Sequence, residues 1–188
     1  PQDLLERAWF IEQVQRAVCE ITALSSAYPG TGILFGTPQP TGRLPGKGLY
    51  NAAVLAYDGA MLASQAKRLL PTYDVFDEAR YFDPARETAV IPFKGERLGV
   101  HICEDAWSDA AMWPRGIPYN VNPISLLSSQ AASLYINISA SPFQVGKETQ
   151  RYQLLRGHAR RAWAPFIYLN QVGANDELIF DGRSLCLD

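Results

Sequence analysis

The sequence predicts a layered α/β protein with a mixed sheet, and three observations support this fold class. The second half of the chain alternates apolar, strand-like runs with helical segments. The first half contains two apolar runs joined by Asp58-Gly59, a strong β-hairpin signal. Hydrophobic residues make up 47% of the 188 residues, enough for one sizeable core. No repeat, low-complexity tract or long linker divides the sequence, so we treat residues 1–188 as one domain.

The first half is expected to begin with a long amphipathic helix. Apolar residues recur at helical spacings over residues 3–27, Asp3 is a suitable N-cap, and Pro29-Gly30 ends the pattern. The elements expected next are a strand (31–38), a Gly/Pro-rich loop (38–48), two hairpin strands (49–57 and 60–66) and a loop rich in aromatic and acidic residues (71–87).

The second half is expected to supply most of the sheet. Its predicted elements are strands at 88–93 and 97–103, a loop at 108–123, a helix at 124–133, a strand at 134–139, a helix at 145–163, a strand at 165–172 and a hairpin within 177–188.

Composition excludes several classes of function. The net charge of −2 and the scattered basic residues disfavour binding to nucleic acid or to an anionic membrane. No apolar run approaches the length of a membrane span. The three cysteines, Cys19, Cys103 and Cys186, lie far apart and form no CxxC pair, so we expect no disulfide framework and no metal site. A reducing, cytoplasmic location fits this pattern best.

Three strand ends carry reactive side chains. Cys103 ends an apolar run and is followed by two carboxylates, Lys67 follows the hairpin, and residues 139–147 follow a buried strand. Ligands of open α/β sheets bind outside the carboxyl ends of the strands. On the strand pattern alone, Cys103 is either a packed hydrophobic residue or a nucleophile.

A cysteine nucleophile needs a neighbouring cation or base, because only the thiolate attacks. His101 lies too far back along the same strand to be an obvious partner, and His158 falls in the middle of a helix, so we expect both to be structural. Lys67 is the better candidate, since an ammonium group both lowers a thiol pKa and stabilises an oxyanion.

Several motifs together resemble one family. They are KRLLPTYDVFDEARYF (67–82), GVHICEDAW (99–107), NISASPFQVGKETQR (137–151) and YLNQVGANDELIFDGRS (168–184). Their order along nearly the whole chain is similar to that in the nitrilase-type (carbon-nitrogen hydrolase) glutaminase domain of glutamine-dependent NAD synthetases. The resemblance implies an αββα sandwich of mixed sheets flanked by helices, and a glutamine amidohydrolase that forms a cysteine thioester.

The resemblance also assigns roles to residues. Cys103 is the implied nucleophile, and Lys67 with the backbone N–H of Glu104 stabilises the oxyanion. Tyr73 lines the glutamine pocket. The remaining implied substrate contacts, to the α-carboxylate and α-amino end, are Ser141 and Lys147; Lys147 stands where other members have Arg, so that contact becomes a point charge.

Two parts of the family pattern are missing from the sequence. The third catalytic residue, a Glu in a P-E-L-type stretch, would precede Pro1, and the synthetase domain with its S-G-G-x-D-S loop would follow Asp188. We therefore expect a partial domain, cut at both ends. This domain is expected to need no cofactor, while ATP and Mg²⁺ (magnesium) act in the synthetase domain. The implied partners are glutamine, the synthetase domain of the same polypeptide and further copies in a homo-oligomer.

Two alternatives stay open. The chain could be a nitrilase-superfamily amidase that acts on another amide. It could also be a catalytically incomplete fragment that only packs or assembles, since the catalytic Glu is absent from these residues.

Overall fold

The computed structural model describes residues 2–109, 113 and 119–188, and it divides the chain into two compact units, Pro1–Arg86 and Glu87–Asp188. Each unit is described by itself. The predicted loop at 108–123 lies partly outside the described residues.

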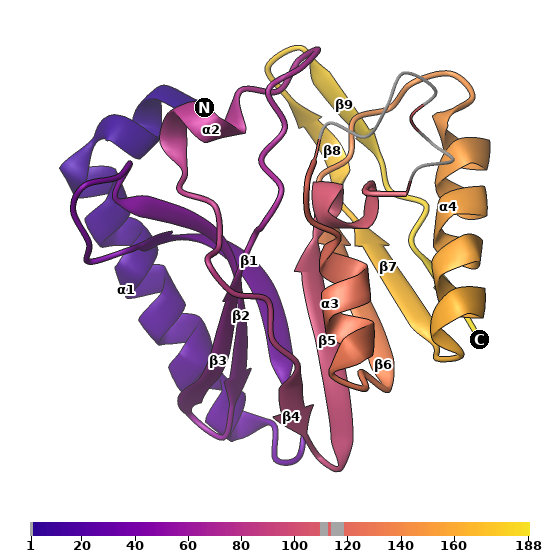
Figure 1. Cartoon of the computed structure of the whole chain (residues 1–188). Helices are drawn as coiled ribbons and strands as arrows, with labels where there is room; N and C mark the ends of the chain where they lie inside the picture. Colours follow the sequence, from indigo (N-terminus) through magenta and orange to yellow (C-terminus); the bar gives the residue numbers. More distant parts are fainter. Residues whose placement is uncertain (1, 110–112, 114–118) are drawn as a thin grey trace. The chain divides into compact units, whose positions relative to one another are not determined.

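The first unit is a three-stranded antiparallel sheet with a helix beside it (Figure 1). The sheet has the order β1-β2-β3, and every residue from Ala52 to Ala56 in the central strand is buried. The elements are η1 (Gln2–Glu6), α1 (Ala8–Leu24), η2 (Ser25–Ala27), β1 (Ile33–Pro40), β2 (Leu49–Tyr57), β3 (Ala60–Ala66) and α2 (Glu78–Tyr81).

The predicted hairpin is confirmed with both strands at their expected bounds. Asp58 and Gly59 both have positive φ (51° and 79°), as a type I′ turn requires. The N–H of Gly59 donates to the Ser25 hydroxyl at 2.8 Å, which ties the turn to the end of the helical segment.

Two expectations for this unit were wrong in detail. The long helix is interrupted at Arg7, which has an extended backbone (φ −99°, ψ 116°) between η1 and α1. The segment 71–87 is not all loop, because α2 forms within it. This helix is only one turn long and has no apolar periodicity, so the sequence alone could not predict it.

The second unit is built on a five-stranded mixed sheet of order β10-β7-β6-β5-β4. Strands β5, β6 and β7 are parallel, and the edge strands β4 and β10 run antiparallel to their neighbours. The elements are β4 (Ile91–Phe93), β5 (Glu96–Ile102), η3 (Cys103–Ala106), α3 (Pro123–Ser129), β6 (Leu134–Ser139), α4 (Lys147–Ala162), β7 (Phe166–Asn170), β8 (Val172–Asn175), β9 (Leu178–Asp181) and β10 (Leu185–Leu187).

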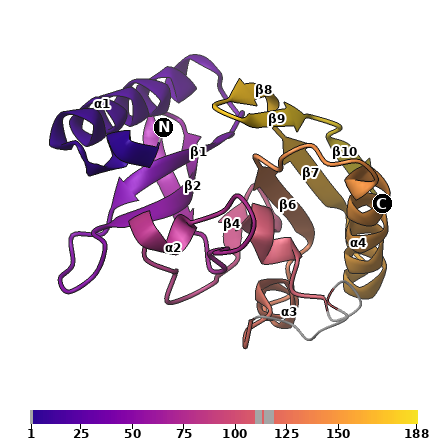
Figure 2. The same cartoon turned by 90° about the horizontal axis from the view of Figure 1, so that it is seen from above.

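Helices α3 and α4 cover the same side of this sheet (Figure 2). Leu127 of α3 and Leu155 of α4 pack with Tyr135 of β6 and Phe166 of β7, all of them at most 1% exposed. The Tyr135 and Phe166 rings stack with their centroids 5.7 Å apart. The expected mixed α/β fold is confirmed.

The predicted final hairpin within 177–188 was wrong. Strand β9 pairs with β8, whereas β10 leaves that ribbon and pairs with β7. The physical reason is that Leu185 and Leu187 pack against the core cluster, while Gly182 (φ 65°) turns the chain between β9 and β10. Within the described residues, the helices are too short or too polar for a membrane span.

Candidate functional site

The parallel strands of the second unit bring three of the singled-out segments to one edge. Cys103 follows β5, residues 139–141 end and follow β6, and Asn170 ends β7. The strand register places Ile102 opposite Ile138 and Ser139 opposite Asn170. The carboxyl edge of this sheet therefore carries the predicted nucleophile and the predicted Ser141 side by side.

Cys103 occupies a sharp, unusual turn. Strand β5 was expected to include Cys103 but ends at Ile102, and Cys103 begins η3 with a φ of 44°, in the left-handed region. The buried Asp105 carboxylate accepts the Ile102 N–H at 3.0 Å, and the Cys103 carbonyl accepts the Asn137 side-chain amide at 3.4 Å. These contacts hold a strained backbone conformation at the half-buried Cys103. Strained backbone conformations of this kind cluster at active sites.

Glu104 is buried rather than solvated. Its side chain is 4% exposed, and its Oε1 accepts the Tyr119 hydroxyl at 2.8 Å. This contact fixes the residue whose backbone N–H follows the thiol. The oxyanion role of that N–H stays a prediction.

Lys147 begins α4, and its ammonium lies 5.9 Å from the centre of the Trp107 ring. Trp107 directly follows η3, so this cation–π contact joins the turn after β5 to the start of α4. Trp107 is the last residue of the C-E-D-x-W motif, and sequence reasoning assigned it no role.

A network of buried polar groups surrounds Ser141, which is 2% exposed. Its N–H donates to Asn170 Oδ1 at 2.8 Å, and its carbonyl accepts from Asn170 Nδ2 at 3.4 Å. Its hydroxyl accepts from Arg151 Nη2 at 3.3 Å. Arg151 also pairs with Asp181 Oδ1 at 3.3 Å, and Asn170 Nδ2 donates to the same oxygen at 3.2 Å.

Tyr168 connects this network to the nucleophile. Burial, with a smaller effect of the negative charge available to Cys103, raises the pKa of Tyr168 to about 12, while Arg151 and hydrogen bonds with Ser139 and Ser141 oppose the shift. The guanidinium carbon of Arg151 lies 5.4 Å from the centre of the Tyr168 ring. Tyr168 therefore stays protonated close to the thiol.

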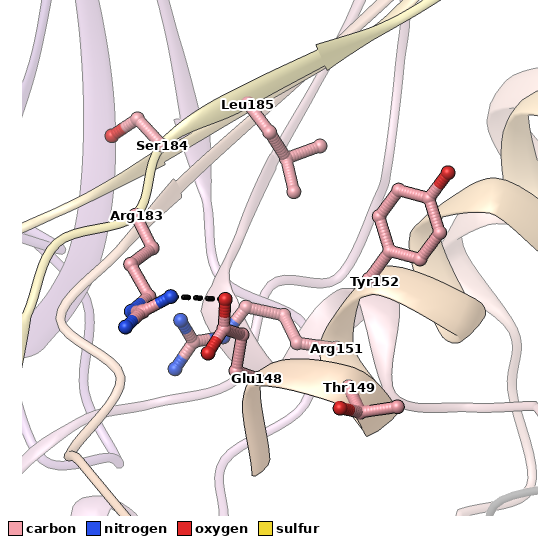
Figure 3. A pocket seen from close by; sticks show the side chains of 7 residues that line it. All are labelled: Glu148, Thr149, Arg151, Tyr152, Arg183, Ser184 and Leu185. Carbon is pink, nitrogen blue, oxygen red and sulfur yellow. Dashed lines mark hydrogen bonds and ion pairs between the residues drawn. The ribbon is translucent and has the colours of Figure 1, made fainter. Parts of the chain in front are cut away.

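Beside the network lies a pocket of about 470 Å³. Figure 3 shows Arg151 lining it together with a rim pair, Glu148 and Arg183, which are linked by a hydrogen bond. The other lining residues are Thr149, Tyr152, Ser184 and Leu185. Both rim residues are more than half exposed, whereas Arg151 is enclosed, so the pocket opens over the outer side of the network.

In the first unit, Lys67 follows β3 and is 1% exposed. Its ammonium donates to Glu78 Oε1 at 2.5 Å, and the other oxygen of that carboxylate accepts from Asn51 Nδ2 at 3.4 Å. The Lys67 backbone is held on both sides, because its N–H donates to Asn51 and its carbonyl accepts from Ala85. Such a pair places an opposite charge beside a buried amino group.

Tyr73 lies in the same unit, in the segment between Pro71 and Glu78. Its side chain is 39% exposed, and its ring meets Phe76 edge-on at 5.7 Å. The Glu78 N–H donates to the Pro71 carbonyl at 3.1 Å and closes the segment. The structure thus leaves part of the Tyr73 ring open to solvent, and its role in a glutamine pocket stays a prediction.

Both histidines lie in the core of the second unit, as expected. Burial lowers the pKa of His101 to about 3 and also lowers that of His158, whose Nε2 contacts the Ala106 carbonyl at 2.7 Å.

Sequence reasoning missed four polar residues of the two clusters: Glu78, Arg151, Asn170 and Asp181. All four lie inside the quoted motifs, but the motifs did not indicate that their side chains are partners of Lys67 and Ser141. The described residues hold no cluster of His, Cys, Asp and Glu suited to a metal ion.

Comparisons with known proteins show which proteins this chain resembles in sequence and in structure. No family model matches the chain. A glutamine-dependent NAD(+) synthetase of a Synechocystis species is 42% identical over 192 residues, which cover all of this chain and 34% of that relative. The structure of a glutamine-dependent NAD+ synthetase from Acinetobacter baumannii matches 98% of this chain and 31% of its own, with a TM-score of 0.79 and 32% identity.

An amidase of the nitrilase superfamily from Nesterenkonia shares the fold, with a TM-score of 0.78 at 21% identity; the match covers all of this chain and 64% of the amidase. The chain spans about a third of the length of the curated relatives it matches.

Proposed function

We propose that this chain is the nitrilase-type domain of a glutamine-dependent NAD(+) synthetase and hydrolyses the side-chain amide of glutamine. The observation that carries the proposal is Cys103, which sits at the carboxyl edge of the parallel strands with a left-handed backbone. The similarity to glutamine-dependent NAD(+) synthetases over the full chain supports amide hydrolysis as the reaction of that cysteine.

The reaction follows from the properties of a thiol at this position. The Cys103 thiolate attacks the amide carbon of glutamine, and the carbonyl oxygen becomes an oxyanion. The backbone N–H of Glu104 is proposed to donate to that oxyanion, and the contacts of the buried Glu104 and Asp105 carboxylates, which hold the turn, support this role. Ammonia leaves as a γ-glutamyl thioester forms, and water then hydrolyses the thioester to glutamate and restores the thiol.

Lys67 is proposed as the second oxyanion donor. Its side-chain nitrogen is buried and held by Glu78 at 2.5 Å, and an ammonium donor at a fixed place is suited to an oxyanion. Its action on the same substrate as Cys103 rests on the resemblance to the family, because the two residues belong to different units. The base that takes the thiol proton and returns it to the leaving amide nitrogen, which departs as ammonia, is by the same resemblance a glutamate outside these residues.

Ser141 and Lys147 are proposed to receive the amino acid end of glutamine, and Tyr73 to line the pocket. The Ser141 hydroxyl is already engaged by Arg151 and the residue is 2% exposed. Its contribution therefore lies in the placement of its segment as much as in its own hydroxyl. Lys147, held against Trp107, provides the positive charge that an α-carboxylate requires.

The ammonia is proposed to feed an ATP-dependent amidation of deamido-NAD in the same polypeptide, with ATP and magnesium acting in that second domain. The relatives are named for NAD(+) synthesis and are about three times as long as this chain. We also propose assembly into a homo-oligomer.

Trapping of the nucleophile tests the proposal in the natural protein that contains this chain. A diazo-ketone analogue of glutamine is expected to label Cys103, with glutamine protecting the site, and Cys103→Ala is expected to abolish both labelling and glutamate release. Cys186→Ala is the matched control, because Cys186 is an exposed cysteine of the same unit. Labelling of Cys186 with Cys103 untouched would refute the assignment. Efficient release of ammonia from simple aliphatic amides but not from glutamine would favour the amidase alternative.

A further inference from the structure

A buried arginine lies behind the proposed glutamine site. Arg151 is 2% exposed and projects from α4, and a buried guanidinium group is costly unless its charge is paired. Two of its nitrogens reach Asp181 Oδ1, at 3.3 and 3.4 Å, and one of them also donates to the Ser141 hydroxyl at 3.3 Å. A planar fork of donors holds a carboxylate and a hydroxyl in a fixed geometry, whereas the lysine ammonium is a compact point charge on a flexible stem.

Asn170 repeats the same connection from the sheet. Its side-chain amide receives the Ser141 N–H, donates to the Ser141 carbonyl and donates to Asp181 Oδ1. Ser141 is therefore held at its N–H, its carbonyl and its hydroxyl, and the Asp181 oxygen is shared by Arg151 and Asn170. The segment after β6 is thus joined to α4, β7 and β9 through buried polar contacts.

The segment is also held from its other side. The Phe143 N–H donates to the Ile179 carbonyl at 2.7 Å, and Pro142 forms an isolated bridge with Phe180 of β9. Only residues 144–146 then separate this held stretch from Lys147 at the start of α4. The positions of the two proposed substrate contacts, Ser141 and Lys147, therefore depend on how β9 and α4 are joined.

The ion pair between Arg151 and Asp181 connects α4 to β9. Arg151 comes from the second turn of α4, and Asp181 is the last residue of β9. Arg151 also overlies the Tyr168 ring, which lies near Cys103 and hydrogen-bonds Ser139 and Ser141. One guanidinium thus touches the elements on either side of the substrate-binding segment.

We propose that Arg151 is a positioning residue, whose hydrogen bond to Ser141 and ion pair with Asp181 fix residues 139–147 in the arrangement that binds glutamine. This inference rests on the proposed function and deepens it, since it assigns glutamine affinity to a residue that does not touch glutamine. The thiol itself is held by other contacts, those of Asp105 and Asn137, so its intrinsic reactivity does not depend on Arg151.

The test compares variants of the natural full-length protein by glutamate release, thermal unfolding and alkylation of Cys103 with iodoacetamide. Arg151→Met removes the buried cation from Asp181 and leaves it only the longer pair with the exposed Arg183, at 3.8 Å, so Tm falls and the KM for glutamine rises. Misplacement of a binding segment by about 1 Å costs roughly 100-fold in kcat/KM, so a loss of about 10- to 100-fold is expected. The rate of iodoacetamide alkylation is expected to stay within about twofold of wild type, because the small reagent does not use the glutamine contacts.

The double variant Arg151→Met/Asp181→Leu separates positioning from stability. It removes both charges, and replacing a buried pair by apolar residues is often neutral for stability, so Tm is expected to recover. The hydrogen bond to Ser141 is still missing, so KM is expected to remain high. Recovery of KM together with Tm would overturn the proposal, because Arg151 would then act only through folding.

Two further variants complete the design. Arg151→Lys keeps the charge opposite Asp181 but offers no fork, so it is expected to fold with KM still raised; a wild-type KM would overturn the role of the Ser141 hydrogen bond. Arg160→Met is the matched control, since Arg160 is an exposed arginine of the same helix, and it is expected to change neither Tm nor KM. If the wild-type protein hydrolyses no glutamine and Cys103 resists the diazo-ketone, the proposed function itself fails, which is distinct from an active enzyme with unaffected Arg151 variants.

Discussion

His101 is expected to make the fold sensitive to acid. The residue lies in the middle of the second unit, is fully buried, and packs edge-on against Phe166 at 5.1 Å and Tyr135 at 6.4 Å. Its Nδ1 contacts the Gly99 carbonyl at 2.9 Å, while its Nε2 is buried and has no hydrogen-bond partner among the residues that the structure describes. A proton on Nε2 would place a charge in an apolar core that offers it no acceptor.

The magnitude follows from the pKa. Burial lowers the pKa of His101 from 6.5 to about 3, the Gly99 carbonyl opposes this effect, and the nearby His158 adds to it. Between these two pH values the unfolded chain binds a proton that the folded chain excludes, so stability rises with pH. Above pH 6.5 His101 is neutral in both the folded and the unfolded chain, and it costs the fold no stability. As the pH falls from 6.5 toward 3, the free energy of unfolding decreases, because only the unfolded chain takes up the proton. At about 1.4 kcal/mol per pH unit, the full loss is about 5 kcal/mol, of which about 3 kcal/mol is lost by pH 4.

The assay is urea unfolding at a series of pH values from 7.5 to 4, for the wild type and for His101→Leu. The wild type is expected to lose stability more steeply than the variant below pH 6.5, by about 1.4 kcal/mol per pH unit. Carboxylates titrate in both proteins, so their contribution cancels in the difference. Tyr135→Phe is the control, since it alters the same cluster without a group that titrates in this range. Parallel curves for the wild type and His101→Leu would refute the reasoning.

Three further predictions concern single contacts. Glu78→Gln removes the charge opposite the buried Lys67 ammonium, so stability is expected to fall by about 3 kcal/mol in chemical unfolding, with glutamate release reduced as well; an unchanged midpoint would contradict a buried ion pair. Gly99→Ala places a Cβ 3.1 Å from a buried tyrosine ring and is expected to cost about 1–3 kcal/mol, whereas Gly157→Ala, in a helix beside a flexible side chain, is expected to be neutral or to stabilise by up to about 1 kcal/mol. Asp83→Ala frees two backbone N–H groups of the loop between β1 and β2, so trypsin is expected to cut that loop faster, and equal digestion rates would count against it.

Local signals predicted much of the fold. Strands β2, β3 and β6 have the bounds expected from their apolar runs and from the Asp58-Gly59 turn, because hairpin chemistry and burial act within a few residues. The errors lie where distant contacts decide. Strand β10 pairs with β7 because Leu185 and Leu187 reach the core, and no local pattern distinguishes this from a hairpin with β9.

The candidate site shows the same division. Cys103 could be singled out from the sequence because it lies at the end of a predicted strand. Its left-handed backbone in the structure supports a functional role at that position. Glu78 could not be assigned, because an acidic residue in a loop-like segment resembles any solvated carboxylate until Lys67 is seen 2.5 Å away. Arg151 was equally hidden, since on a charged helix only its burial distinguishes it from exposed neighbours such as Arg160.

The helix-covered face of the five-stranded sheet changes character along its strands. Near the amino ends it presents stacked aromatic rings, and near the carboxyl ends it presents polar side chains that are buried or half-buried. The two rows run through Tyr135, Asn137 and Ser139 on β6 and through Phe166, Tyr168 and Asn170 on β7. Apolar packing stabilises more than a buried ion pair does, so the polar end of the face costs stability that the aromatic end does not. Directional hydrogen bonds fix a segment in one place, whereas apolar contacts tolerate sliding. The polarity of this face therefore rises where the segment that follows β6 must be held, and Arg151 with Asp181 lies at that end.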